Sequence, residues 1–395
     1  MSKTGLVTTV ATVWTRRNCG GSDGDRRSTS RRDSQIPSHG IRRTNRGGGQ
    51  LRKATLRSKA TIRSSTTIAA ERKKTSVVVT GAAGFAGGHL VDLLVDEGLA
   101  VDAWHRPGSE PDPQLKRSNR VRWRAIDVLD VDSVMQTIEE SRPDVIFHCA
   151  AAARVGLSWE QTENSLVTNV RGTKILLEAV HRSGCRPRLL IPGSALVYRQ
   201  STSALSEDAP FGPSSPYAVS KLAQEQLAVR FTAENGCRVI LTRSFNHTGP
   251  RQSPFFSASS FARSIARIEA GQAEPTIHTG NLDTRRDLTD VRDTVRAYQK
   301  LADHGVSGRI YNVCSGHAYP IREVLNRLIA LARVKVKVQV NPSQFRQNDT
   351  PVVLGDPTRI RSEIGWVPRI PLKQTLSDLL DYWRQALTTS TRAGA

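Results

Sequence analysis

A tyrosine and a lysine stand four residues apart in the run Tyr217-Ala-Val-Ser-Lys221. On a helix, residues at this spacing lie on one face, so the phenol and the ammonium would be neighbours. Ser214 or Ser215 can cap such a helix, with Pro216 in its first turn. A nearby positive charge favours the phenolate and lowers the tyrosine pKa. The pair therefore predicts a group that moves a proton to or from an oxygen of a bound molecule.

A serine precedes this pair at a second chemically useful position. Ser194 follows an apolar run at 188–192 that is typical of a buried strand. Parallel sheets bind their ligands at the carboxyl edge, where a strand of this kind would end. We therefore expect Ser194 to hydrogen-bond both the reacting oxygen and the phenol of Tyr217. Ser194, Tyr217 and Lys221 form the predicted catalytic set.

A glycine run lies between a β-branched segment at 76–80 and an amphipathic helix pattern at 87–97. Its glycines are Gly81, Gly84 and Gly87, a GxxGxxG spacing. Glycines in such a turn let a pyrophosphate approach the backbone N–H groups at a helix N-terminus. The run therefore predicts a dinucleotide cofactor.

The end of the second predicted strand selects between the two nicotinamide cofactors. An acid there would bind the ribose hydroxyls of NAD, whereas an arginine favours the 2′-phosphate of NADP. The chain has Arg106 at this point, and by alternation Asp102 lies inside the strand. We expect NADP(H), with NAD(H) as the alternative. Asp127, after the third predicted strand, can accept a hydrogen bond from the adenine amino group.

Strands and helices alternate through the first part of the chain body, which is typical of a parallel sheet covered on both faces. The predicted strands are 76–80, 99–104, 121–126, 144–149, 188–192 and 238–242. The predicted helices are 87–97, 131–141, 165–183 and 217–235. We expect an α/β fold, a Rossmann-type doubly wound parallel sheet with a smaller mixed α/β lobe.

The predicted division of the chain follows from this pattern. Residues 75–245 would form a dinucleotide-binding Rossmann domain that carries the catalytic residues, and residues 246–388 mainly a substrate-binding lobe. A strand at 310–314 is expected to return to the Rossmann sheet. Residues 1–74 are expected to be a disordered basic extension.

That extension concentrates the positive charge of the chain. It holds 18 of the 57 Lys and Arg residues but only four of the 36 Asp and Glu residues, within a total net charge of +21. Its Arg-, Ser- and Gly-rich composition cannot bury enough apolar surface to offset the entropy of ordering. Three interpretations stay open: binding of nucleic acid or an anionic surface, an organellar transit peptide, or an extension without function.

Several classes of protein are disfavoured by what the sequence lacks. No stretch approaches 18 apolar residues, and no convincing secretory signal is present. The five cysteines are far apart and form no CxxC pair, and the nine histidines have no metal-binding spacing. We therefore expect a cytoplasmic enzyme with no metal, no membrane association and no nucleic-acid partner.

The chain resembles the extended short-chain dehydrogenases, the NAD-dependent epimerase/dehydratase family, over residues 75–387. The blocks that carry this resemblance are TGAAGFAG at 80–87, HCAAAA at 148–153, TNVRGT at 168–173, GSALVY at 193–198 and SPYAVSK at 215–221. Within the family it is most similar to the GDP-4-dehydro-6-deoxy-mannose reductases and GDP-mannose 4,6-dehydratases. That closer resemblance rests on the segments at 243–256, 280–293, 311–316 and 355–384.

The resemblance implies a nucleotide-sugar substrate, a homodimer and further contacts. The additional cofactor contacts that it implies are Phe85, Ala86, Val128, Ala150 and Ala151, beside Tyr217 and Lys221 themselves. The substrate contacts are Ser194, Asn246, Arg251, Arg286 and Arg346. Arginine suits this role because its guanidinium can bind a diphosphate with two hydrogen bonds.

One position bears on the reaction. A dehydratase needs a further acid/base group near the sugar, which in the family is a Glu two residues after the catalytic hydroxyl residue. This chain has Leu196 there. We therefore expect NADPH-dependent reduction of the 4-keto group of GDP-4-dehydro-6-deoxy-mannose to GDP-rhamnose. The alternatives are a GDP-mannose 4,6-dehydratase, a nucleotide-sugar 4-epimerase, and a non-enzymatic NADP-binding scaffold or sensor.

Overall fold

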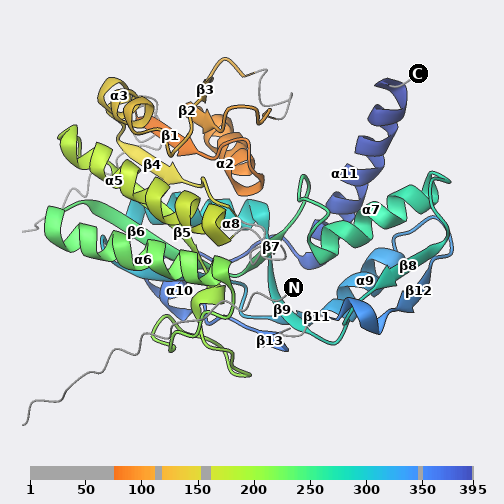
Figure 1. Cartoon of the computed structure of the whole chain (residues 1–395). Helices are drawn as coiled ribbons and strands as arrows, with labels where there is room; N and C mark the ends of the chain where they lie inside the picture. The colour runs from red at the N-terminus through yellow and green to blue at the C-terminus, as the bar shows by residue number, and fades with distance from the viewer. Residues whose placement is uncertain (1–74, 112–117, 153–161, 346–349, 394–395) are drawn as a thin grey trace, which may run out of the picture. The chain divides into compact units, whose positions relative to one another are not determined.

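The computed structural model describes residues 75–111, 118–152, 162–345 and 350–393 (Figure 1). Its central feature is a seven-stranded sheet in the order β10-β6-β5-β4-β1-β2-β3, in which every neighbouring pair is parallel. The strands are β1 (Ser76–Thr80), β2 (Ala100–His105), β3 (Val121–Ala125), β4 (Val145–His148), β5 (Arg188–Ser194), β6 (Arg238–Ser244) and β10 (Ile310–Val313). The predicted Rossmann-type α/β fold is confirmed.

Helices cover both faces of this sheet, as a parallel sheet requires. On one face the core joins the sheet to α2 (Phe85–Asp96), α8 (Val291–His304) and α10 (Thr358–Ile364). On the other face it joins the sheet to α3 (Val131–Ser141), α5 (Gly172–Arg182) and α6 (Pro216–Asn235). Val77, Val78 and Val79 of β1 are almost fully buried between the two layers, which explains the unbroken β-branched run at this point of the sequence.

A separate apolar cluster is built from later parts of the chain. It joins α7 (Ser257–Glu269), α9 (Ile321–Ile329) and α11 (Leu372–Ala393) to the β8 strand (Thr276–Thr279), which pairs with β12 (Lys337–Val340). These elements lie together at the right of Figure 1. A four-stranded sheet has β9 (Arg285–Asp290) paired with β7 (Asn246–Thr248), β11 (Ala318–Pro320) and β13 (Val352–Val353).

Three elements of the central layers, β10, α8 and α10, come from beyond residue 245. β10 pairs with β6 along the edge of the main sheet, at the position where we expected a late strand. Helix α8 packs on the same sheet, although the sequence analysis did not identify it. The second half of the chain therefore contributes a strand and two covering helices to the central layers.

The helix expected at 165–183 is not one regular helix. A short α4 (Thr162–Leu166) passes into a π-helical turn at Val167–Arg171 before α5 begins. A π-helical turn shifts the hydrogen-bond register by one residue, and such turns are frequent at functional sites. Here the turn contains Asn169, whose side chain is fully buried.

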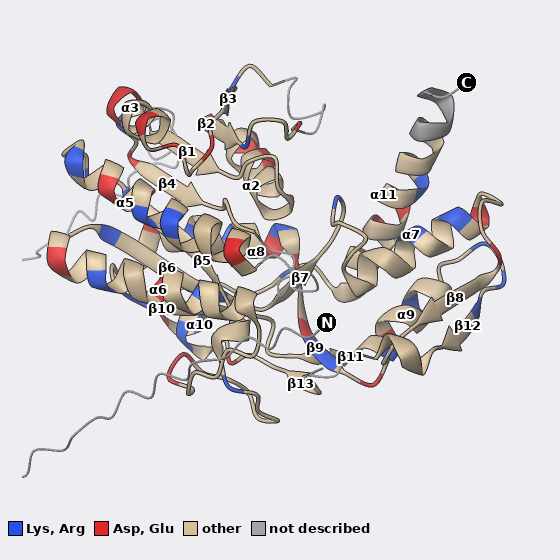
Figure 2. Ribbon diagram, viewed as in Figure 1, with Lys and Arg blue, Asp and Glu red and all other residues tan. Residues whose placement is uncertain are grey.

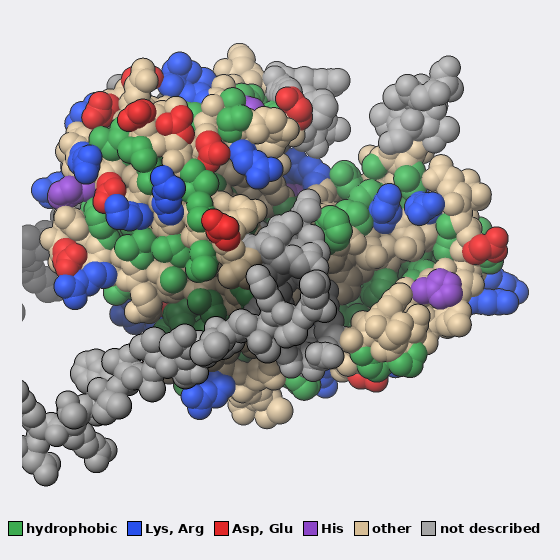
Figure 3. All heavy atoms as spheres, viewed as in Figure 1, with side chains coloured by type: hydrophobic (Ala, Val, Ile, Leu, Met, Phe, Trp, Pro, Cys, Tyr) green, Lys and Arg blue, Asp and Glu red, His purple; other side chains and the backbone are tan. Residues whose placement is uncertain are grey.

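Charges of both signs are interspersed over the described helices in Figure 2. On the face drawn in Figure 3, basic and acidic side chains likewise alternate over the helices at the left. Within the part of the chain that the structure describes, no helix is both long and apolar enough to cross a membrane.

Candidate active site

The predicted catalytic residues meet at the carboxyl edge of the main sheet. Ser194 is the last residue of β5, and Tyr217 and Lys221 stand one turn apart in α6. The hydroxyl of Ser215 accepts a hydrogen bond from the backbone N–H of Ala218 at 3.2 Å and caps this helix. The Ser194 hydroxyl is close enough to the Tyr217 phenol to favour its ionised form. The structure thus brings together the two hydroxyls that the sequence analysis assigned to the reacting oxygen.

The ionisation of the pair differs from our expectation. Burial raises the pKa of Tyr217 to about 12, and the nearby Ser194 hydroxyl offsets this only in part. The expectation that Lys221 lowers the pKa of Tyr217 is wrong for this structure. The Lys221 Nζ donates instead to the carbonyl of Pro192 at 2.9 Å and to the Gln224 Oε1 at 2.8 Å. Burial lowers the pKa of Lys221 to about 8.

The glycine run forms a close junction between β1, α2 and the end of β4. Gly81 has φ +65°, and a Cβ there would lie 2.6 Å from the backbone nitrogen of Ala150. A Cβ on Gly87 would lie 2.2 Å from the Gly81 carbonyl oxygen. Gly84 is the N-cap of α2, whose first turn contains no acidic residue and receives no cap from a described side chain. The arrangement fits a pyrophosphate at this helix N-terminus.

The other predicted cofactor positions follow neighbouring strands of the same edge. Arg106 is exposed directly after β2, whereas Asp102 lies inside that strand, with Arg124 as its ion-pair partner at 3.1 Å. Asp127 follows β3, and its carboxylate accepts a hydrogen bond from the backbone N–H of Leu129 at 2.9 Å. The remaining predicted contacts lie in the glycine loop or after β3 and β4, namely Phe85, Ala86, Val128, Ala150 and Ala151. Their contact with a cofactor stays a prediction.

The predicted substrate residues are not all brought together. Asn246 is exposed at the start of β7, and the Arg286 Nη1 of β9 donates to the carbonyl of Thr350 at 2.7 Å. Arg251, with φ +69°, donates from its Nη2 to the Asp92 carboxylate of α2. Arg346 lies outside the described residues.

The surroundings of Arg251 set it apart from the other candidates. It lines a cavity of about 630 Å³ with His89, Arg292 and Asp378, among others, and it is the only one of the described predicted site residues that does so. The ion pair with Asp92 already engages its guanidinium. A contact between Arg251 and the nucleotide stays a prediction.

Asn169 is a site residue that the sequence analysis missed. It is fully buried in the π-helical turn, and its Oδ1 accepts from the backbone N–H of Ala152 at 2.9 Å. Its Nδ2 donates to the Ala152 carbonyl at 3.3 Å and to the Ser220 hydroxyl at 2.9 Å. The side chain thus ties α6 to the segment after β4 that carries Ala150 and Ala151. The block TNVRGT at 168–173, one of those that carry the family resemblance, was the signal that could have indicated it.

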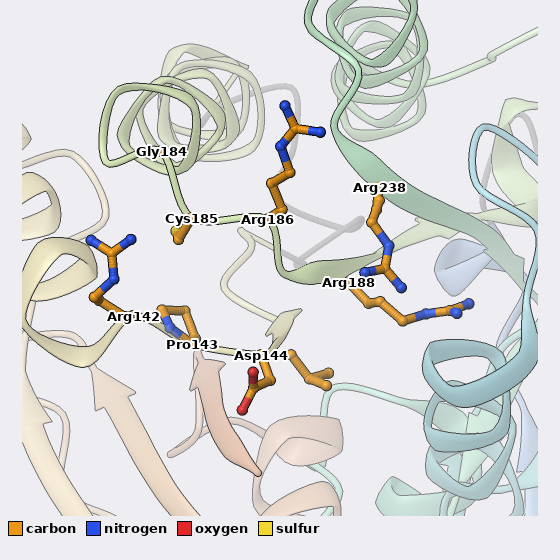
Figure 4. Close-up of a pocket in the computed structure, with 9 residues that line it drawn as sticks. Arg142, Pro143, Asp144, Gly184, Cys185, Arg186, Arg188 and Arg238 are labelled. Carbon is orange, nitrogen blue, oxygen red and sulfur yellow. The ribbon is translucent and has the colours of Figure 1, made fainter.

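The opposite edge of the sheet contains a cavity of about 520 Å³ lined by arginines (Figure 4). Its arginines are Arg142, Arg186, Arg188 and Arg238. Arg142 donates to the carbonyl of Ser183, which caps α5, and Arg188 to the carbonyl of Gly305, which caps α8. Cations at helix C-termini offset the unpaired carbonyls and the helix dipole. These two contacts give the basic cluster a structural role, away from Ser194.

Metal ligands do not converge in the part of the chain that the structure describes. No group of three or more His, Cys, Asp or Glu side chains is close enough there to hold an ion. Cys149, Cys185, Cys237 and Cys314, the cysteines among the described residues, are free thiols.

Comparisons with known proteins agree with this geometry. The family model described as GDP-mannose 4,6 dehydratase matches residues 78–379. The chain is 35% identical to GDP-6-deoxy-D-mannose reductase of Pseudomonas aeruginosa over 308 residues, which cover 77% of this chain and 96% of the relative. It is 25% identical over 358 residues to a GDP-mannose 4,6-dehydratase of Vibrio cholerae, and the match covers 78% of this chain and 93% of that relative.

Solved structures give the same result. RMD of Pseudomonas aeruginosa, solved in complex with NADPH, matches with a TM-score of 0.71 and 32% identity, covering 79% of this chain and all of that one. UDP-glucose 4-epimerase of Thermus thermophilus, in complex with NAD, matches with a TM-score of 0.70 and 27% identity, with coverage of 79% and 100%. The chain therefore belongs to the GDP-mannose 4,6-dehydratase family of extended short-chain dehydrogenases, and it is an NAD(P)-dependent oxidoreductase that acts on a nucleotide sugar.

Proposed function

We propose that this enzyme reduces the 4-keto group of GDP-4-dehydro-6-deoxy-mannose to GDP-rhamnose with NADPH. The observation that carries the proposal is the presence of Leu196, beside Ser194 and Tyr217, at the position where a dehydratase needs an acid. The similarity to a GDP-6-deoxy-D-mannose reductase supports the same substrate.

The residues divide the work of a ketone reduction. Bound NADPH would supply the hydride that reaches C4 of the sugar. Ser194 donates a hydrogen bond to the ketone oxygen and orients it, and Tyr217 gives its phenolic proton to the same oxygen as negative charge develops. Water then returns a proton to the phenolate, while the ammonium of Lys221, a predicted cofactor contact, would hold the nicotinamide ribose. The raised pKa of Tyr217 suits this direction, because the reaction needs the phenol to hold its proton beforehand.

Leu196 weakens the dehydratase alternative. Elimination of water across C5 and C6 requires a group that removes the C5 proton, and an alkyl side chain cannot exchange a proton. Leu196 lies in the short helical turn after β5, where its backbone N–H donates to the Ser194 Oγ at 3.2 Å. Its position beside the catalytic serine makes its chemistry relevant to the reaction.

The cofactor preference is part of the same proposal. Arg106 is exposed at the tip of β2 and is available for a 2′-phosphate, while Asp102 is engaged by Arg124 inside the strand. This supports NADPH over NADH. A homodimer and a cytoplasmic location remain predictions from the sequence.

Incubation with GDP-mannose and NADPH, with and without a separate dehydratase, tests the proposal. We expect no turnover without the dehydratase, and NADPH oxidation with formation of GDP-rhamnose when it is present. Product identification by NMR distinguishes the two C4 epimers. Conversion of GDP-mannose to the 4-keto sugar by this chain alone would instead establish a dehydratase.

A further inference from the structure

Behind Lys221, buried polar side chains form a continuous hydrogen-bonded chain through the protein. The Gln224 Oε1 accepts from Lys221, and the Gln224 Nε2 donates to the Thr173 Oγ1 at 2.6 Å. The Thr173 Oγ1 lies 3.0 Å from the His148 Nε2, and the His148 Nδ1 lies 2.9 Å from the Thr80 Oγ1. All five side chains are at most 4% exposed. This series of hydrogen bonds runs from α6 through α5 and β4 to β1.

The direction of each hydrogen bond can be assigned. The hydroxyl of Thr173 donates its only proton to the carbonyl of Asn169 at 2.7 Å, so it can only accept from its other partners. His148 must therefore hold its proton on Nε2, and the Gln224 amide nitrogen must face Thr173. Thr80 accepts from the backbone N–H of Ala150 at 3.2 Å and donates to the free Nδ1 of His148. A neutral His148 is consistent with burial, which lowers its pKa to about 3.

These assignments fix the orientation of the Gln224 amide, so its nitrogen and oxygen cannot exchange places. Its amide nitrogen is fixed by an acceptor, so its carbonyl oxygen is aimed at the ammonium of Lys221. The second acceptor of Lys221, the Pro192 carbonyl, is also uncharged. Lys221 is thus a buried cation held by two neutral oxygens.

We propose that Gln224 is a positioning residue, whose amide, oriented by Thr173 and His148, holds the Lys221 ammonium in place for catalysis while adding no counter-charge. The inference rests on the proposed function only in giving Lys221 a catalytic role. The three-residue spacing of Lys221 and Gln224 puts them on one face of α6, which makes the contact local and rigid.

The uncharged partner has a measurable consequence for ionisation. Around Lys221, burial raises the pKa of Tyr217 and of Cys149 to about 12 and that of Tyr298 further, while His148 stays neutral. Lys221, with a pKa lowered to about 8, is therefore the group among these that changes charge between pH 7 and 10. A carboxylate in place of the amide would favour the ammonium and move this ionisation to higher pH.

The test compares Gln224→Glu, Gln224→Met and a matched control, Gln299→Met. Gln299 is another buried helical glutamine, but it lies in α8 and donates to Glu97. NADPH affinity is measured by fluorescence from pH 7 to 10, above the second pKa of a phosphate, which is about 6. This titration needs no sugar, so it stays informative if the keto sugar proves to be the wrong substrate. Turnover with the keto sugar is measured in parallel.

For the wild type we expect affinity to fall with a midpoint near pH 8, as Lys221 loses its proton. Gln224→Glu should raise this midpoint by about one unit or more, and Gln224→Met should lower it. Gln224→Met should also lower kcat by about 10- to 100-fold with little change in the KM of the sugar, since displaced catalytic groups cost rates of this order. The Gln299→Met enzyme should match the wild type in both measurements.

Three results would overturn the proposal. These are a wild-type profile that is flat from pH 7 to 10, a Gln224→Glu midpoint equal to that of the wild type, and midpoints of the two Gln224 variants that move in the same direction. Thermal unfolding identifies a variant that is not folded. If Gln224→Met fails to fold, the pH midpoint of Gln224→Glu still tests the proposal, because the carboxylate of this variant retains an oxygen acceptor for Lys221.

Discussion

Helix α6 supports two buried cation sites one turn apart, and they are built on opposite principles. Lys221 is held by the carbonyl of Pro192 and the amide of Gln224, both neutral. Four residues after Lys221, Glu225 forms two hydrogen bonds, of 2.7 and 2.8 Å, with the guanidinium of Arg243 on β6. Both members of this second pair are at most 2% exposed.

The difference in partner sets the difference in ionisation. Burial lowers the pKa of Lys221 to about 8. Burial acts in the same direction on Arg243, but the hydrogen bonds that its guanidinium donates to Glu225 and the contact with Tyr198 outweigh it, so the pKa of Arg243 is raised. The charge of Arg243 is therefore permanent and joins α6 to the sheet, whereas the charge of Lys221 can respond to a ligand. Lys221, the cation with the catalytic role, is hydrogen-bonded to neutral oxygens, whereas Arg243, the structural cation, is paired with the carboxylate of Glu225.

The largest effect is expected at the catalytic end of α6. Tyr217→Phe should reduce turnover of the keto sugar by about 10²- to 10⁴-fold, because it removes the positioned proton donor. NADPH affinity and thermal stability should change little, since the hydroxyl serves the reacting oxygen. Stopped-flow measurement of NADPH oxidation gives the rate. Near-normal turnover in this variant would leave Ser194 or a water as the donor and refute the assignment.

The second largest effect, on stability, is expected at the ion pair of Glu225 and Arg243. Glu225→Ala leaves Arg243 as an uncompensated buried charge, which should lower the free energy of unfolding by about 3–5 kcal/mol. The guanidinium would retain only its contacts with the Glu207 carbonyl and with the rings of Tyr198 and Phe211.

Denaturant unfolding measures this loss, and a double variant provides the control. Glu225→Met combined with Arg243→Met removes both charges, so it should recover a large part of the stability that Glu225→Ala loses. If Glu225→Ala is as stable as the wild type, the ion pair of Glu225 and Arg243 does not stabilise the fold as the comparison of the two cation sites requires.

The comparison also marks what could be predicted from the sequence. The spacing of Tyr217 and Lys221, the cap at Ser215 and the strand before Ser194 are local patterns, and each appears in the structure as expected. The hydrogen bond between Lys221 and Gln224 could have been suspected from a three-residue spacing on one helix. Its extension to Thr173, on a different helix, depends on how α5 and α6 pack.

The misses have physical causes. Helix α8 has apolar residues at Val291, Val295, Tyr298 and Leu301, a clear helical period, but the segment before it was interpreted as a substrate motif. The π-helical turn at Val167–Arg171 leaves no periodic signal, because it adds one residue to a turn. The raised pKa of Tyr217 depends on burial, which helical spacing alone does not determine.

A smaller effect is expected at the cofactor specificity position. Arg106→Asp should weaken NADPH by about 10- to 100-fold and NADH much less, because the carboxylate repels a 2′-phosphate and a lost charged contact costs about 1.5–3 kcal/mol. Asp102→Asn is the matched control, since Asp102 lies on β2, the strand that Arg106 follows, but is engaged by Arg124. Fluorescence titration measures both cofactors. Equal weakening of NADPH and NADH would show that the specificity residue lies elsewhere.

The smallest effect is expected from removal of residues 1–74. Strand β1 begins at Ser76, and the described hydrophobic clusters that support both cation sites begin at Val77. Turnover should stay within about twofold of the full chain, and the free energy of unfolding within about 0.5 kcal/mol, as for changes outside a packed core. The removed segment carries 18 Lys and Arg residues, so any binding to nucleic acid or anionic vesicles should be lost with it and should weaken with salt in the full chain. A truncated enzyme that misfolds or loses most of its turnover would mean that residues 1–74 take part in the catalytic body itself.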